Sequence, residues 1–127
     1  MSNALPTTVP SINERINGFI NAVNAMFADA NAKSPEHMHD YHKPLEIRNG
    51  RASGDWMILD HVSGSSRSVY AFIRLTDGEN KTMGKMKAGD IHRPASYKTP
   101  AKHARASVFD ADFGASCAEV HGIAYLR

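Results

Sequence analysis

The spacing of apolar positions predicts one amphipathic helix near the start of the chain. Apolar residues recur every three or four positions, which places them on one helical face: Ile12, Ile16, Phe19, Ile20, Val23, Met26 and Phe27. Ser11 and Glu14 have the spacing of a capping box, in which each side chain bonds the backbone N–H of the other residue. We predict a helix over residues 11–33, preceded by a flexible arm at residues 1–10. Its apolar face needs a partner, either the sheet of its own chain or a second copy.

From residue 44 onward the pattern changes to a period of two, which is typical of strands. The segments "DWMILDHV" (55–62) and "RSVYAFIRL" (67–75) predict two strands, joined by the short loop "SGSS" at 63–66. Shorter strands are predicted at "PLEIR", "DIHR" and "GIAYLR", with a tight turn at "NGR". Both faces of 67–75 carry apolar residues, so we expect a central strand that is covered on both sides.

Two segments show no clear period. Residues 76–90 contain three glycines and several lysines, which predicts a long flexible loop. Residues 93–114 carry Pro94 and Pro100 and predict an irregular wrap, with a helical turn at 100–106. The whole pattern predicts a small α+β domain over 11–127: the helix packs on a three- or four-stranded antiparallel sheet, a connector spans 34–43, and the sheet and C-terminal wrap span 44–127.

Composition narrows the classes of protein that fit. A length of 127 residues suits one domain, and 42% hydrophobic and 22% charged residues are ordinary for a globular chain. The single cysteine, Cys117, excludes an intrachain disulfide and a cysteine-rich zinc site. No apolar run approaches the roughly 18 residues of a membrane span, and the N-terminus lacks the pattern of a secretory signal. We therefore expect no membrane association and a reducing compartment.

The segment "PEHMHDYH" at 35–42 concentrates residue types that bind metals. His37, His39 and His42 lie there together with a glutamate and an aspartate. No single regular conformation gathers the three histidines, because His37 and His42 share neither a helical face nor a strand face. We therefore expect a connector or contact surface, no bound metal and no other cofactor. Ser34 and Pro35 predict a short helix start, with Ser34 as N-cap and Pro35 at the first helical position.

Positive charge is concentrated in one segment. The formal net charge is only +2, but residues 81–105 contain seven Lys or Arg residues against one acid, Asp90. Cations that meet phosphates, and an aromatic ring that stacks on a base, are typical of nucleic-acid and nucleotide sites. The candidate ligand-binding residues are Arg93, Tyr97, Lys98, Lys102, His103 and Arg105, with long-range attraction from Lys81, Lys85 and Lys87. The alternative is an ordinary charged surface, with Arg93 or Arg105 paired to Asp90 or Asp110.

Three stretches carry a resemblance to a known group of proteins. "SRSVYAFI" (66–73), "GDIHRPASYKTPAKHAR" (89–105) and "GIAYLR" (122–127) resemble a family of small tailed-bacteriophage proteins that has no settled activity. The resemblance covers about a third of the chain and implies a viral origin and expression inside a bacterial cell. This chain departs from the pattern in two places: it inserts "ENKTMGKMKA" where the family has a tight turn, and it has Tyr97 where the family has tryptophan.

These observations lead to three functional hypotheses. The first is a non-enzymatic phage accessory protein that binds nucleic acid or a nucleotide through residues 93–105. The second is an interaction protein, either a virion component or an inhibitor of a host protein, that uses residues 34–43 and the asparagine face of the helix: Asn13, Asn17, Asn21 and Asn24. The third and weakest is a metal-dependent hydrolase. We expect a homo-oligomer located in the host bacterial cytoplasm, with the virion as the alternative location.

Overall fold

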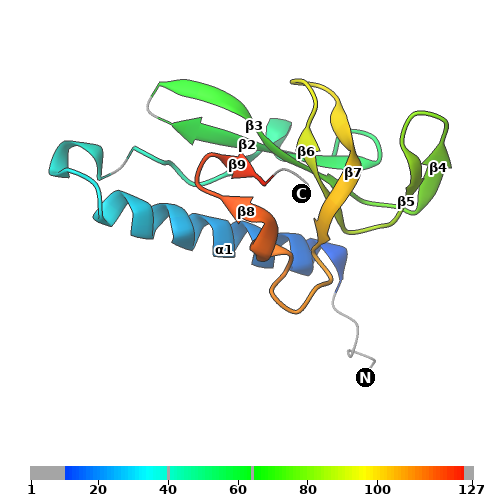
Figure 1. Ribbon diagram of the computed structural model, residues 1–127, viewed down its shortest axis with the longest axis horizontal. Helices are drawn as coiled ribbons and strands as arrows, with labels where there is room; N and C mark the ends of the chain where they lie inside the picture. The colour runs from blue at the N-terminus through cyan, green and yellow to red at the C-terminus, as the bar shows by residue number, and fades with distance from the viewer. Residues whose placement is uncertain (1–10, 40, 64, 125–127) are drawn as a thin grey trace.

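The computed structural model describes residues 11–39, 41–63 and 65–124, and one long helix lies along one face of a five-stranded sheet (Figure 1). The predicted arm at residues 1–10 and the last three residues of "GIAYLR" lie outside the described residues. Within them, the chain forms the α+β fold that the sequence predicts.

The helix α1 (Ile12–Ala32) forms as its sequence pattern predicts. The Ser11 hydroxyl accepts from the Glu14 N–H, and the Glu14 carboxylate accepts from the Ser11 N–H, both at 3.2 Å, so the capping box is complete. Ile16, Phe19 and Phe27 are among the helix residues that are fully buried against the sheet. The apolar stripe therefore finds its partner in its own chain.

The main sheet has one strand more than the largest number predicted. Its spatial order is β1 (Glu46–Ile47), β2 (Trp56–Ser63), β3 (Ser66–Arg74), β6 (Asp90–Pro94) and β7 (Pro100–Ser107), and all neighbours are antiparallel. The predicted hairpin of β2 and β3 is confirmed, with Ser63 paired to Ser66. β3 is the central strand, as both of its apolar faces predict.

Two predictions of irregular structure are wrong. The segment 76–90 contains a hairpin of β4 (Gly78–Asn80) and β5 (Gly84–Met86), closed by the Asn80 side chain, which accepts from the Met83 N–H. The segment predicted as an irregular wrap contains β7 and no helical turn at 100–106. Neither segment shows a regular alternation of apolar and polar residues. Their strand conformation comes from pairing with a neighbouring strand.

The connector and the C-terminal part are built from short elements. They are the 3-10 turns η1 (Glu36–Met38), η2 (Arg48–Gly50) and η3 (Ala115–Cys117), and the hairpin of β8 (Ala118–Glu119) and β9 (Gly122–Ile123). The predicted cap at Ser34 is wrong. Pro35 occupies the N-cap position of η1 without a side-chain bond, and the Ser34 hydroxyl donates back to the Ala30 carbonyl.

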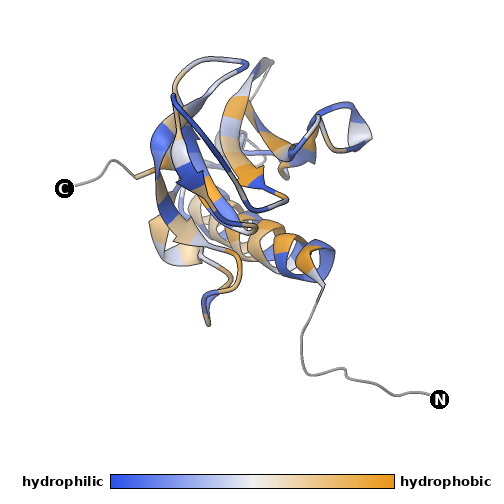
Figure 2. Ribbon diagram, turned by 90° about the vertical axis from the view of Figure 1, so that its right-hand side faces the viewer, coloured by the Kyte–Doolittle hydropathy of each residue, from blue (hydrophilic) through white to orange (hydrophobic). Residues whose placement is uncertain are grey.

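Apolar side chains are buried on both faces of the sheet, whose strands curve above the helix in Figure 2. Leu59 and Ala71 belong to the main core between the sheet and the helix, together with residues of η3 and β9. Their strand neighbours Ile58 and Phe72 project to the opposite face and are also buried, with the Trp56 ring 6.1 Å from that of Phe72. The helix thus covers one face, and on the other face the Trp56 ring lies against Phe72 and His92.

Candidate functional site

Among the described residues, Tyr97 is the most exposed large hydrophobic residue, and it lies in the turn between β6 and β7. The turn is closed by the N–H groups of Ala95 and Ser96, which donate to the Thr99 carbonyl at 2.8 and 3.0 Å. Tyr97 is 52% exposed, yet its ring and its backbone are both in contact with Arg48. The guanidinium carbon of Arg48 lies 3.8 Å from the ring centroid, and Arg48 also donates to the Tyr97 carbonyl at 2.8 Å. One residue of η2 therefore fixes both the ring and the backbone of the turn.

Arg48 is in turn held by a buried carboxylate on β2. Asp60 is 2% exposed and accepts from Arg48 through both oxygens, the shortest bond being 2.7 Å from a terminal nitrogen. Arg67 approaches the same carboxylate at 3.5 Å and pairs more closely with Glu46, at 2.6 Å. A buried carboxylate needs such partners because its charge is otherwise poorly solvated. The planar fork of arginine satisfies it from one fixed direction.

The predicted ligand-binding residues separate into two groups. Lys98, Lys102 and His103 are exposed, and they follow Tyr97 along the turn and the first half of β7, the edge strand of the sheet. Arg93 and Arg105 instead donate through Nε to the carbonyls of the C-terminal segment, at Ile123 and Ala124.

Arg93 and Arg105 are half-buried beside that segment. Burial, and then the neighbouring positive charge of Arg93, lower the pKa of Arg105 from its ordinary value. Among the described residues, neither arginine forms an ion pair with Asp90 or Asp110, whose carboxylates accept the N–H groups of Lys87 and Ser107. The two arginines therefore anchor the end of the chain.

The three loop lysines lie on the small hairpin. Lys85 belongs to β5, Lys81 to the turn before it, and Lys87 follows it; all three are exposed. Their charges face solvent, and their predicted long-range attraction for a ligand stays a prediction.

The three histidines of "PEHMHDYH" do not form one site. His37 is exposed in η1, and the ring of His39 bonds the Ser34 carbonyl. His42 instead joins His61 of β2 and His121 of the β8–β9 turn, with ring centroids 5.6 and 6.2 Å away. Within the described ranges, no group of three or more His, Cys, Asp or Glu side chains is placed to hold a metal ion.

This histidine cluster lies in an apolar setting. The Phe27 ring is 5.5 Å from His42 and 5.0 Å from His61. Burial, and then repulsion from His42 and His121, lower the pKa of His61, while burial and then His121 lower that of His42. Nδ1 of His42 and Nε2 of His61 have no hydrogen-bond partner among the described residues. The cluster is therefore suited to the neutral form of both rings.

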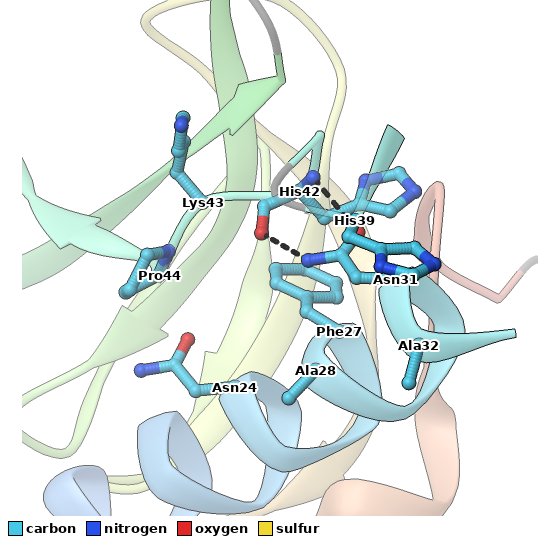
Figure 3. A pocket seen from close by; sticks show the side chains of 9 residues that line it. All are labelled: Asn24, Phe27, Ala28, Asn31, Ala32, His39, His42, Lys43 and Pro44. Atoms are coloured by element: carbon cyan, nitrogen blue, oxygen red, sulfur yellow. Dashed lines mark hydrogen bonds between the residues drawn. The ribbon is translucent and has the colours of Figure 1, made fainter. Parts of the chain in front are cut away.

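A cavity of about 380 Å³ lies between the second half of α1 and the connector (Figure 3). It is lined by Asn24, Phe27, Ala28, Asn31, Ala32, His39, His42, Lys43 and Pro44. The Asn31 amide donates to the His42 carbonyl and accepts from its N–H, at 2.9 and 3.1 Å, while Asn24 accepts from the Leu45 N–H. Asn31 thus binds the connector, and Asn24 of the asparagine face binds the segment that follows it, whereas Asn13, Asn17 and Asn21 remain exposed.

Sequence reasoning missed Arg48 and Asp60. One signal for Asp60 was available: it is an acid inside an otherwise apolar strand, where a buried carboxylate implies a cationic partner. Arg48 had no comparable signal, because it lies twelve positions away and reaches Asp60 through the pairing of β1 with β2.

These features define a small α+β domain with an exposed aromatic turn and neighbouring cations at one edge of its sheet. A family of unknown function, DUF7717, has a model that matches residues 6–125, and the chain belongs to that family. No curated protein and no solved structure matches it. Among the described residues, no helix is long and apolar enough to cross a membrane.

Proposed function

We propose that this protein is a non-enzymatic binding protein for a phosphate-bearing partner, either nucleic acid or a nucleotide. The proposed binding surface consists of Tyr97, Lys98, Lys102 and His103. The observation that carries the proposal is the Tyr97 ring, which is half exposed at a turn and rests on the Arg48 guanidinium. An aromatic ring presented in this way, next to lysines, combines a stacking surface with phosphate contacts.

The charge distribution supports the same surface. Lys98 and Lys102 are exposed, and among the described residues their ammonium groups make no hydrogen bond or ion pair. Arg93 and Arg105, in contrast, are bonded to backbone carbonyls. The exposed lysines of the β4–β5 hairpin contribute at longer range, where positive potential raises the rate of association with a polyanion.

The resemblance to tailed-phage proteins supports a biological setting for this activity. We propose a viral accessory protein that acts in the bacterial cytoplasm, with the virion as the alternative location. In either setting phage or host nucleic acid is an abundant polyanion, so a modest local positive charge has a partner.

The test is binding of a fluorescently labelled oligonucleotide, measured by anisotropy over a range of salt concentrations. For a single strand, log K is expected to fall with log salt with a slope of about −0.7 per phosphate contacted. Lys98→Ala and Lys102→Ala should each weaken binding and make the slope shallower by about that amount. Lys33→Ala is the matched control, because Lys33 is also an exposed lysine and pairs with Asp29 at the end of α1. Absence of binding, or equal effects of all three variants, would overturn the proposal.

A protein partner is the second candidate, because Asn13, Asn17 and Asn21 form an exposed, uncharged polar stripe on α1. The apolar stripe of α1 no longer argues for a homo-oligomer, since the protein's own sheet covers it. Light scattering tests self-association through the asparagine stripe. A dimer that Asn17→Lys converts to a monomer would support it, and a monomeric parent protein would remove it.

A further inference from the structure

We propose that Asp60 and Arg48 hold Tyr97 as a one-sided platform for an unpaired base, so that the partner is single-stranded nucleic acid. This inference rests on the proposed function and narrows it. Tyr97 would touch the base, whereas Arg48 and Asp60 would act as positioning residues behind it.

The Tyr97 ring is held from one side. Arg48 covers one face of Tyr97 at 3.8 Å, and it also bonds the carbonyl of the same residue. The ring and the turn therefore have little freedom to lose when a ligand binds, and preorganisation of this kind improves affinity. Because one face is covered and the residue is still 52% exposed, the remaining surface offers room for one stacked base.

Arg48 is anchored by the buried Asp60 carboxylate. Its side chain is 13% exposed, and Asp60 behind it is buried with two carboxylate oxygens engaged. The ion pair neutralises the guanidinium, so Arg48 contributes position rather than net charge. Lys98 and Lys102 would therefore make the phosphate contacts. Variants of these lysines and variants of Arg48 should separate phosphate binding from positioning of the ring.

The faces of the bases are accessible in single strands and covered in duplexes. In a duplex each base is stacked on both faces and paired at its edge, so a ring that binds by stacking must first disrupt the helix. In a single strand the faces are available, and stacking on an aromatic side chain is worth about 1–3 kcal/mol per base. The turn of the β6–β7 hairpin projects from the sheet (Figure 1). Tyr97 lies in this turn, where an unpaired base can reach it.

The experiment compares three probes with the full chain: a labelled oligothymidylate of about 12 nucleotides, a duplex of equal length, and a mononucleotide. We expect the single strand to bind at least tenfold more tightly than the duplex. Tyr97→Leu should weaken single-strand binding roughly tenfold, which corresponds to about 1.4 kcal/mol, with an unchanged salt slope. Tyr97→Phe should retain binding, because it keeps the ring.

Asp60→Asn tests the positioning role. It should weaken single-strand binding without the shallower salt slope expected of Lys98→Ala, because it removes no phosphate contact. Arg67→Gln is the control, because it removes the more distant partner of Asp60 and leaves Arg48 in place. Arg48→Lys is the second variant should Asp60→Asn fail to fold: it keeps the charge but lacks the planar fork, and the same loss is expected.

A measurement without ligand reports the position directly. The Arg48 side-chain N–H signals should be shifted upfield by the Tyr97 ring in NMR spectra, and the shift should disappear in Tyr97→Leu and in the Asp60 variant. Equal binding of duplex and single strand would overturn this inference while leaving the proposed function intact. Full binding by Tyr97→Leu would overturn this inference and would also remove Tyr97 from the proposed binding surface. Failure of the parent protein to bind any of the three probes would overturn both.

Discussion

Gly18 lies in the middle of α1, where its missing side chain makes room for Phe113. Helix propensity alone favours Gly18→Ala by about 1 kcal/mol. The structure opposes it, because a Cβ at position 18 would lie 2.3 Å from Cδ1 and 2.4 Å from Cε1 of the Phe113 ring. Carbon atoms cannot approach so closely, so either the ring or the helix must move.

The ring is not free to move without cost. The Arg15 guanidinium lies over it at 4.1 Å, and Arg15 is itself bonded to the Val108 carbonyl at 2.8 Å. Overpacking of this kind costs about 1–3 kcal/mol, and loss of an exposed cation–π contact adds about 0.5–1 kcal/mol. After subtracting the gain in helix propensity, Gly18→Ala should lower the free energy of unfolding by about 0.5–3 kcal/mol.

Urea unfolding followed by circular dichroism measures this change, provided that the slope with urea is the same in both proteins. Asn17→Ala is the matched control, because Asn17 is exposed and the change should stabilise the helix by a few tenths of a kcal/mol. In a Phe113→Ala background the obstacle is gone, and Gly18→Ala should become stabilising. A Gly18→Ala protein more stable than its parent would refute the reasoning.

Three further predictions concern other parts of the structure. The folded protein lowers the pKa of His61 and His42, so these rings bind protons more tightly in the unfolded state. The free energy of unfolding should therefore be constant at high pH and should fall as the pH drops below about 6.5, the ordinary pKa of histidine. His61→Phe should flatten this decline in thermal melts recorded between pH 8 and 5, and an unchanged profile would argue against the cluster as its source. Burial raises the pKa of Cys117 to about 11, so a thiol reagent at pH 8 should react slowly with the folded protein and rapidly in urea; equal rates would contradict the buried position. Asn31→Ala should destabilise the protein by about 1–3 kcal/mol, because it leaves the backbone groups of His42 without their partners, and hydrogen exchange at the His42 N–H should accelerate relative to that of the β3 amides.

The elements that the sequence predicts correctly are those whose signals are local. The helix is predicted by a capping box and an apolar repeat that lie in one continuous segment. The β2–β3 hairpin is predicted by the alternation of apolar and polar residues on both sides of a short loop. β7 has no such signal, since Lys102, His103 and Ala104 are exposed in it and its apolar side chains are small. It becomes a strand because its backbone pairs with β6, which is a contact between chain segments that the local pattern does not encode.

The candidate site divides in the same way. Composition alone determined that residues 81–105 are basic and that one aromatic residue stands among their cations. Only the tertiary structure decided which of those cations remain exposed, because the carbonyls that engage Arg93 and Arg105 belong to the last part of the chain. It also decided that Tyr97 rests on Arg48 and Arg48 on Asp60, since β-sheet pairing and burial of one carboxylate bring together three residues that no spacing in the sequence connects.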